Sequence, residues 1–396
     1  MKILQLTNYP TSKPQHGGQI RARQLAEALR RAGHEVKAVA VYPKDAYKSD
    51  SQDDVIFAPD SPFWRSEIDF LSDYLSGIYA AEDGQAFGSL ARTAAEHRPD
   101  VIISEHPWLM QVARKLADAQ GGSKLVYSSH NVEFRLKRGI LDKAKISPQD
   151  RARLVHEIEQ LEHDAVRHAD LVIACTTADA DYYRDHVAGC PEVVVAGNGV
   201  EPFACKPARV EAWRHFFGAP FPVFVSSAHI PNASGFWEMM TPGLTFLRPD
   251  ERVIVVGGVS NLIDQIKGFE AYAAVNRSRM EVMGLMEKSE LQALVTAAHV
   301  IMLPIVEGEG SNLKTAEALE AGCSIVGTTK AFRGFEEAKR LPHVHIADEP
   351  EAFRRKVREV LDAPRYDRGT PDAVRARFYW AQLLGEAVSR IGALNS

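Results

Sequence analysis

Residues 304–319 read Pro-Ile-Val-Glu-Gly-Glu-Gly-Ser-Asn-Leu-Lys-Thr-Ala-Glu-Ala-Leu, and this stretch decides the fold. The apolar run Val300–Pro304 at its start is typical of a buried strand. Gly308 and Gly310 then predict a tight turn, and the helix-forming residues after them predict a helix. A strand, a glycine-rich turn and a helix in this order present unpaired backbone N–H groups and a positive helix end to an anion. The stretch therefore predicts a phosphate-binding site.

The same stretch carries two carboxylates and one lysine. Glu309 stands in the expected turn, and Glu317 follows eight residues later inside the expected helix. Each carboxylate can accept hydrogen bonds from sugar hydroxyls. Lys314 lies in the first turns of the helix, where a cation is unfavourable unless an anion compensates, although a solvated or salt-bridged lysine is the alternative. Phosphate donors beside hydroxyl acceptors suit a nucleotide sugar.

The composition describes an ordinary soluble globular protein. The chain has 396 residues, enough for about two to three domains, with 45% hydrophobic and 25% charged residues. Its net charge of −5 gives no support for a nucleic-acid partner. No apolar run reaches the roughly 18 residues of a membrane-spanning helix, and Met1–Thr7 is typical of a first strand rather than a signal peptide. The four cysteines show no metal-ligand spacing and no disulfide framework, which predicts reduced thiols in a cytoplasmic enzyme.

Short apolar runs alternate with longer amphipathic runs, which is typical of βαβ units and parallel sheets. The strands expected in the first half are Lys2–Thr7, Glu35–Val41, Val101–Ser104, Lys124–Ser128, Leu171–Ala174 and Glu192–Val195. Those expected in the second half are Pro222–Ser226, Arg252–Val256, Met280–Val282, Val300–Leu303 and Ser324–Gly327. The clearest expected helices are Gln19–Ala32, Leu109–Ala119, Asp150–His168 and the closing helix Arg375–Ile391.

This pattern predicts an α/β protein with two Rossmann-like, doubly wound parallel-sheet domains. We expect an acceptor-side domain over residues 1–205 and a nucleotide-sugar domain over 206–374. For the closing helix, within 375–396, packing against the first domain is one option. Ligands of such domains lie at the carboxyl ends of the strands, so we expect both domains to face one cleft.

Other candidate residues follow expected strands. Gly17 and Gly18 precede a long helix that carries Arg21, which indicates either a plain tight turn or a close approach to an anionic ligand. The spacing is not Gly-x-Gly-x-x-Gly and no acidic residue ends the second strand, so a nicotinamide dinucleotide is not indicated. Residues 226–235 combine small and hydroxyl side chains with an expected helix start, which could cradle a phosphate.

Two histidines also stand where strands end. His130 and His106 are both expected at the carboxyl edge of the first sheet, with a purely structural polar role as the alternative for each. Asn198 and Gly199 indicate a turn. Residues 134–146 carry five basic residues against one acid, which indicates either a solvated helix face or docking on an anionic membrane or lipid-linked acceptor.

Taken together, these segments resemble the retaining glycosyltransferases of family 4, which have the GT-B fold. The resemblance covers essentially the whole chain. The motifs that carry it are Gly17-Gly18-x-x-Arg21, Ser129-His130-Asn131, Asn198-Gly199-Val200-Glu201 and above all Glu309-x₇-Glu317 within Gly310–Ala318 and its flanks.

The resemblance implies a role for each site residue. Glu309 would contact the donor sugar, Glu317 the ribose hydroxyls, and His130 the transferred sugar from the acceptor side. The expected catalytic residues are Glu309, His130 and Lys314, and the expected acceptor-side residues are His106 and Asn131. The expected donor-binding residues are Gly17, Gly18, Arg21, Ser227, Asn232, Gly310, Ser311, Asn312, Leu313 and Glu317.

One departure from the family concerns the leaving group. Many members carry an arginine and a lysine at the start of the second domain that stabilise the leaving diphosphate. Residues 226–235 contain neither, and Ser227, His229, Asn232 and Ser234 stand in this stretch instead. Charge stabilisation would then come from Lys314, Arg21 and the helix dipole, or catalysis would be weak.

The expected reaction moves a hexose-like unit from a nucleoside-diphosphate sugar to a carbohydrate, lipid-linked or other hydroxyl acceptor, with retention of configuration. No metal or other cofactor is expected, since no Asp-x-Asp lies in a suitable loop. The expected setting is surface-glycan or glycoconjugate synthesis in the cytoplasm, with peripheral contact at the inner membrane face as an option. Acceptor choice is expected to depend on Tyr42–Glu67 and residues 134–146. A nucleotide-sugar epimerase or hydrolase and a non-catalytic binding subunit stay as alternatives.

Overall fold

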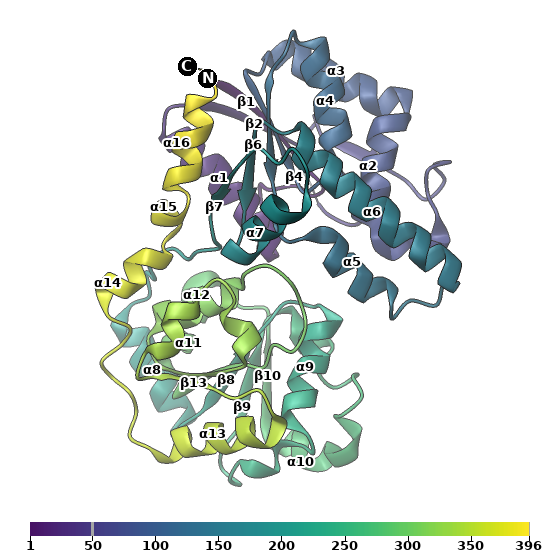
Figure 1. Ribbon diagram of the computed structural model, residues 1–396. Helices are drawn as coiled ribbons and strands as arrows, with labels where there is room; N and C mark the ends of the chain where they lie inside the picture. The colour runs from purple at the N-terminus through teal and green to yellow at the C-terminus, as the bar shows by residue number, and fades with distance from the viewer. Residues whose placement is uncertain (49–50, 396) are drawn as a thin grey trace. The chain divides into compact units, whose positions relative to one another are not determined.

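The computed structural model describes residues 1–48 and 51–395 (Figure 1). Residues 49 and 50, which fall in the segment expected to choose the acceptor, lie outside the described residues, as does residue 396. The chain divides into two compact units. The first unit comprises Met1–Gly197 and Leu383–Ser396, and the second comprises Asn198–Gln382.

The first unit is built on one parallel sheet. Its strands are β1 (Lys2–Thr7), β2 (Glu35–Pro43), β3 (Val55–Phe57), β4 (Val101–Glu105), β5 (Lys124–Ser128), β6 (Leu171–Ala174) and β7 (Glu192–Val195). They pair in the order β3-β2-β1-β4-β5-β6-β7, so the direction of winding reverses between β1 and β4. Its helices are α1 (Gly17–Arg31), α2 (Ser72–Glu82), α3 (Gly84–His97), α4 (Met110–Ala119), α5 (Glu133–Leu141), α6 (Pro148–His168), α7 (Thr177–His186) and α16 (Gly385–Ala393).

Helices cover both faces of this sheet because successive strand residues point to opposite sides. On β1, Leu4 and Leu6 join an apolar cluster with side chains of α2, α4 and α6. Gln5 points to the other face, where its amide donates to the Ala22 carbonyl of α1 at 2.9 Å. Apolar strand residues on both faces are typical of a doubly wound sheet.

The closing segment does not form the single helix that was expected. It consists of α14 (Asp372–Arg375), a 3₁₀ turn (Ala376–Phe378), α15 (Trp380–Leu383) and α16. The prediction of one helix was wrong because the chain is extended at Tyr379, where Val200 N–H donates to the Phe378 carbonyl at 2.9 Å and Trp380 N–H donates to the Val200 carbonyl at 3.2 Å. Helix α16 then packs on α1 and buries Ala387 and Ile391 completely (Figure 1).

The second unit repeats the architecture. Its strands are β8 (Pro222–Val225), β9 (Val253–Val256), β10 (Met280–Gly284), β11 (Val300–Leu303), β12 (Ser324–Gly327) and β13 (Val344–Ile346). They pair in parallel in the order β10-β9-β8-β11-β12-β13. Its main helices are α8 (Pro207–Phe217), α9 (Ile230–Met240), α10 (Ala273–Ser278), α11 (Lys288–Ala297), α12 (Leu313–Ala321) and α13 (Pro350–Asp362).

The second sheet is also covered on both faces (Figure 1). Ile301 and Leu303 of β11 pack with α8, α11 and α12, whereas Val300 and Met302 pack with α9 and α13. The winding reverses between β8 and β11. The predicted fold class, two doubly wound parallel-sheet α/β domains, is confirmed. In such sheets a ligand lies beyond the carboxyl ends of the strands at the reversal point, which here is the end of β8 and β11.

Candidate functional site

The turn after β11 has the shape that its glycines allow. Gly308 and Gly310 have φ of 113° and 67°, in the left-handed region that favours glycine. Asn312 is extended, and α12 begins at Leu313. The first N–H groups of a helix have no partner within that helix. The turn therefore brings the start of α12 to the carboxyl edge of the sheet, as expected for an anion site.

Lys314 connects this helix to the first turn of α9, the helix that follows β8. Its ammonium group donates to the Asn232 side-chain oxygen at 2.8 Å, and burial lowers the pKa of Lys314 to about 8 while Glu317 opposes that shift. The Asn232 amide nitrogen lies 3.2 Å from both the carbonyl and the hydroxyl of Ser227. The structure thus brings together three residues expected in the donor site from distant parts of the sequence.

Two glycines that follow β9 and one glycine of α9 explain how these segments approach one another. A Cβ on Gly257 would lie 2.3 Å from the Ser226 carbonyl oxygen, and one on Gly258 would lie 2.7 Å from the Ala228 nitrogen. A Cβ on Gly235 of α9 would likewise lie 2.9 Å from the Pro304 carbonyl oxygen. Side chains at these positions would push the loops apart.

The two carboxylates of the motif have different surroundings. Glu309 has a side chain that is 38% exposed and lies 3.3 Å from Arg333. Glu317 is partly buried on α12, and burial raises its pKa to about 7 although Lys314 and Lys288 lower it. A carboxyl group that is recessed and half-protonated near neutral pH can exchange its proton for a hydrogen bond from a ligand hydroxyl.

Two further contacts complete this end of the second unit. Asn198 donates from its backbone N–H to the Ser311 hydroxyl at 3.1 Å and from its side chain to the Ser311 carbonyl at 2.9 Å. Asn198 therefore braces the glycine turn from outside it. The turn expected at Asn198 and Gly199 is not formed, since the chain makes no turn there and neither residue has a positive φ. Arg333, which the sequence reasoning did not select, contacts the glycine turn from the loop after β12. The signal that could have found Arg333 is its place after β12, because β12 is the strand beside β11.

A buried network of histidines and carboxylates occupies the carboxyl edge of the first sheet. His130 Nε2 lies 2.7 Å from Glu105, and His106 Nδ1 lies 2.9 Å from Glu133. The Tyr9 hydroxyl lies 2.9 Å from His106 Nε2 and 3.4 Å from His130 Nδ1. Both imidazole rings therefore have their two nitrogens engaged within the first unit.

Electrostatics assign the hydrogen positions of this network. Burial, together with His106, lowers the pKa of His130 to about 3, so its ring is neutral. Burial would raise the pKa of Glu133, but His106 and Lys137 lower it to about 2, so it is ionised. A neutral His130 ring that donates its Nε2 hydrogen to the Glu105 carboxylate turns its Nδ1 lone pair toward the Tyr9 hydroxyl. Substrate contact through either ring nitrogen of His130 requires one of these bonds to open.

The loop that carries His130 is held by a buried carboxylate of α6. Glu162 accepts backbone N–H groups from Glu133 at 2.8 Å and Phe134 at 2.9 Å, and the Tyr183 hydroxyl at 2.7 Å. Asn131 donates to Glu133 at 3.0 Å, so this expected acceptor-side residue belongs to the same network.

The first residues of α1 make contacts within the first unit that the sequence did not predict. A Cβ on Gly18 would lie 2.7 Å from the Tyr9 hydroxyl, so this glycine makes room for Tyr9. Gly17 is the first residue of α1. Arg21 is 2% exposed and donates to the Ala196 carbonyl at 2.8 Å, so its guanidinium is engaged inside the first unit. The donor-binding roles of these three residues stay predictions.

The basic stretch 134–146 is partly used by the protein itself. Lys137 is buried, lies 2.5 Å from Asp73 and sits over the ring of Trp108. Arg135 stacks over Tyr182 at 4.2 Å. Lys143 and Lys145 are exposed.

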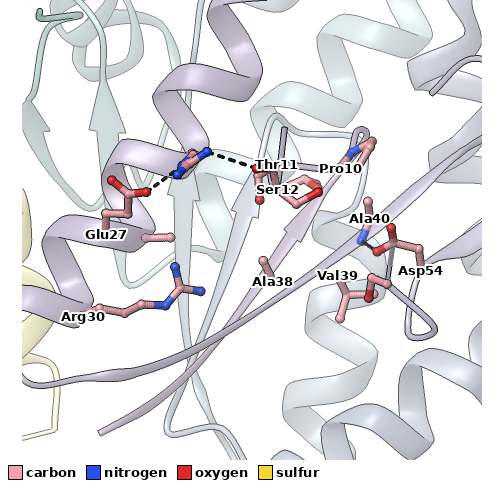
Figure 2. Close-up of a pocket in the computed structure, with 13 residues that line it drawn as sticks. Pro10, Thr11, Ser12, Glu27, Arg30, Ala38, Val39, Ala40 and Asp54 are labelled. Carbon is pink, nitrogen blue, oxygen red and sulfur yellow. Dashed lines mark hydrogen bonds and ion pairs between the residues drawn. The ribbon is translucent and has the colours of Figure 1, made fainter. Parts of the chain in front are cut away.

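A separate hollow of about 310 Å³ lies between α1, β2 and the loop after β1 (Figure 2). Arg23 pairs with Glu27 at 2.6 Å and donates to the Ser12 carbonyl at 3.0 Å, and Asp54 accepts the Ala40 N–H at 2.9 Å. These charged groups of the hollow thus bond to one another or to the backbone of the first unit.

Residues 1–48 and 51–395 contain neither a candidate metal site nor a candidate membrane-spanning helix. No group of three or more His, Cys, Asp or Glu residues in these ranges is arranged to hold a metal ion. No helix formed by the described residues is both long and apolar enough to cross a membrane. Cys175, Cys190, Cys205 and Cys323 are free thiols.

Family comparison matches both halves of the chain. Residues 16–199 match the family described as "Glycosyl transferase 4-like domain", and residues 223–363 match "Glycosyl transferases group 1". None of the curated proteins compared with the chain matches it significantly.

Solved structures with the same fold have low sequence identity. Sucrose-phosphate synthase from Thermosynechococcus elongatus is 16% identical with a TM-score of 0.71, over 99% of this chain and 100% of that one. HepE from Anabaena in complex with UDP-glucose is 15% identical with a TM-score of 0.64, over 100% of both chains. The UDP-forming trehalose-phosphate synthase from Burkholderia xenovorans, in complex with glucose-6-phosphate, is 14% identical with a TM-score of 0.61, over 100% of this chain and 99% of that one.

The family matches account for most of the chain, and the motif residues lie where a doubly wound sheet binds its ligand. The chain therefore belongs to the family 4-like glycosyltransferases with the GT-B fold.

Proposed function

We propose that this glycosyltransferase moves a sugar from a nucleoside-diphosphate sugar to a hydroxyl acceptor with retention of configuration. The observation that supports the proposal best is the convergence of Lys314, Asn232 and Ser227 at the start of α12, between Glu309 and Glu317 of the same motif. HepE was solved with UDP-glucose, and a trehalose-phosphate synthase with glucose-6-phosphate, which favours a nucleotide sugar as donor.

In this proposal the diphosphate binds at the start of α12. The backbone N–H groups of Ser311, Asn312 and Leu313 donate to its oxygens, and Lys314 supplies the positive charge. Because burial lowers the pKa of Lys314 to about 8, an incoming anion raises that pKa and is bound more tightly by the charged lysine.

The carboxylates recognise hydroxyl groups. Glu317 accepts the ribose hydroxyls, and Glu309 in the exposed turn accepts hydroxyls of the transferred sugar. Both assignments follow from the family resemblance and agree with the burial of each side chain. His130, in its neutral state, contributes on the acceptor side.

The chemical step is a displacement at the anomeric carbon. The bond from C1 to the diphosphate oxygen breaks, the acceptor oxygen bonds to C1 on the same face, and the acceptor proton passes to an oxygen of the departing diphosphate. Charge builds on that diphosphate, so donors fixed around it supply most of the rate enhancement. We propose that Lys314 and the start of α12 fill this role without a metal ion.

The proposed setting is the synthesis of surface glycans or glycoconjugates in the cytoplasm, with a carbohydrate or lipid-linked acceptor. Exposed cations at Arg135, Arg138, Lys143 and Lys145 favour a peripheral contact with anionic lipid. Sedimentation with phosphatidylglycerol vesicles at low and moderate salt tests this contact, and no binding at low salt contradicts it.

The donor is tested by thermal shift with UDP-, GDP-, ADP- and dTDP-sugars. The proposal predicts stabilisation by one nucleotide class, retention at the anomeric carbon in the product by NMR, and activity that survives EDTA. Full-rate release of free sugar without acceptor identifies a hydrolase, and an epimerised donor identifies an epimerase. A chain that no nucleotide sugar stabilises is a non-catalytic relative.

A further inference from the structure

One arginine grips the glycine turn that carries Glu309. Arg333 donates from Nε to the Gly310 carbonyl at 3.1 Å and from Nη1 to the Gly308 carbonyl. The same Nη1 lies 3.3 Å from a carboxylate oxygen of Glu309. A single side chain therefore contacts three consecutive residues of the motif.

The Arg333 contacts matter because the two glycines of the turn allow its backbone many conformations. Residues 304–312 lie between the end of β11 and the start of α12. Two glycines flank Glu309, and glycine populates many backbone conformations at similar free energy. A guanidinium offers N–H donors in a rigid planar fork, which can fix two carbonyls and a carboxylate in one arrangement.

The loop that carries Arg333 is itself anchored to both ends of this segment. The Thr328 hydroxyl donates to the Ile305 carbonyl at 2.5 Å, near the end of β11. The Thr315 hydroxyl, in the first turn of α12, donates to the Ala331 carbonyl at 2.5 Å. Thr329 is in turn held by Asp348, at 2.6 Å from its N–H and 2.7 Å from its hydroxyl. Arg333 therefore acts from a fixed base.

The ion pair itself contributes little to stability. The side chains of Arg333 and Glu309 are 26% and 38% exposed, and solvent screens ion pairs at such positions. Its effect is geometric, because the arginine fixes the backbone on either side of Glu309 and one of its oxygens. Because a carboxylate is a rigid planar group, the same contacts also fix the direction of its other oxygen.

We propose that Arg333 is a positioning residue that holds Glu309 for the hydroxyls of the transferred sugar, and so determines which sugar is accepted rather than how tightly the nucleotide binds. This inference rests on the proposed function. Arg333 bonds to the glycine turn, whereas Glu317 and Lys314, which would bind the nucleotide, lie on α12 outside these bonds. A change at Arg333 should therefore separate sugar recognition from nucleotide recognition.

The test compares UDP with UDP-glucose, or the pair that the thermal-shift panel selects, by calorimetry. In Arg333→Ala the Kd for the free diphosphate should stay within about twofold, while the nucleotide sugar binds about 10- to 100-fold more weakly, as for a lost hydrogen bond to a charged group. Arg333→Lys should not restore the difference, because one ammonium group cannot replace the planar fork.

A double-mutant cycle decides whether Arg333 acts through Glu309. In the Glu309→Ala background, Arg333→Ala should cause no further loss of nucleotide-sugar affinity. Additive losses, or equal losses for UDP and UDP-glucose, overturn the inference while leaving the proposed function intact. A wild-type chain that binds neither ligand overturns both.

The control is Arg365→Ala. Arg365 also donates to two backbone carbonyls of the second unit, those of Thr296 and Ala297, but it is remote in sequence from the glycine turn. Its removal should lower the melting temperature without changing the ratio of the two Kd values. A changed ratio in this variant would mean that any loosening of the second unit alters sugar recognition, which contradicts the proposal.

Discussion

The ammonium group of Lys314 lies 2.8 Å from the side-chain oxygen of Asn232, and this bond joins the first turn of α12 to the first turn of α9. The lysine thus donates to a neutral amide oxygen rather than to a carboxylate. A cation at the start of a helix is electrostatically unfavourable, and an anionic ligand removes that cost. Lys314 thereby brings a positive charge to residues 226–235, which contain no arginine or lysine of their own.

Replacing Lys314 should weaken diphosphate binding. We expect Lys314→Met to raise the Kd for UDP, or for the diphosphate that the panel selects, by about 10- to 100-fold, because a charge-assisted hydrogen bond is lost. Isothermal titration calorimetry measures the change. Lys356→Met is the control, since this lysine of α13 pairs with Glu359. Unchanged affinity in Lys314→Met would remove the lysine from the site.

Glu309 should be needed for transfer but not for nucleotide binding. Glu309→Ala removes the carboxylate from the turn, so transfer should fall at least about 100-fold while the Kd for the free diphosphate changes little. The matched control is Glu307→Ala, an exposed glutamate two residues earlier in the same turn. Turnover near the wild-type rate in Glu309→Ala would sink its assignment to the donor sugar.

Glu317 should make the free energy of unfolding depend on pH when no ligand is added. Burial raises its pKa from 4.5 to about 7, so the folded protein binds a proton there that the unfolded chain releases earlier. The resulting stabilisation is complete below pH 4.5 and is lost as the pH rises through 7. Thermal unfolding of Glu317→Gln between pH 4.5 and 7.5 should show a flatter curve than the wild type, and an identical curve would refute the shift.

Lys314 contributes with the opposite sign. Its pKa is lowered from 10.5 to about 8, so its stabilisation is present above pH 10.5 and is lost as the pH falls through 8. Glu317 and Lys314 therefore both contribute least to the free energy of unfolding between about pH 7 and about pH 8, the pKa values of the two groups in the folded protein. Saturating diphosphate should raise the melting temperature most strongly in that range.

Tyr9 should matter for the acceptor side more than for overall stability. Tyr9→Phe removes the hydroxyl that lies 2.9 Å from His106 Nε2 and 3.4 Å from His130 Nδ1, which should cost about 1–3 kcal/mol in the free energy of unfolding because buried ring nitrogens lose their partner. It should also change the KM for the acceptor. Tyr74→Phe is the control, because that hydroxyl bonds Glu157 at 3.1 Å outside the histidine network. Equal effects of both variants on transfer would leave Tyr9 a purely structural role.

The strands were predictable because burial on both faces makes them short, uniformly apolar runs. Every strand expected from the sequence is present, with small shifts at the ends. β3 and β13 were missed because each has only three residues and lies at a sheet edge, where one neighbour suffices. The break at Tyr379 was missed because it depends on pairing with Val200, far away in the sequence.

The candidate site was predictable where its residues are adjacent in sequence. The motif from Glu309 to Glu317 needs only a strand, a turn and a helix. Arg333, Tyr9 and Glu105 were missed because their contacts depend on which strands are neighbours, and the order of strands cannot be obtained from periodicity. The contact of Arg21 with Ala196 was missed for the same reason, since the two residues are distant in the chain.

The last residues of the chain are structural parts of the first unit. Leu383–Ser396 belongs to it, with Ala387 and Ile391 buried against the unit that Met1–Gly197 begins. During synthesis the first unit therefore cannot complete its packing until the ribosome has released the final helix, after the whole second unit has emerged. A protein truncated at residue 382, or an isolated fragment ending at residue 197, would expose the apolar surface of α1 that α16 normally covers.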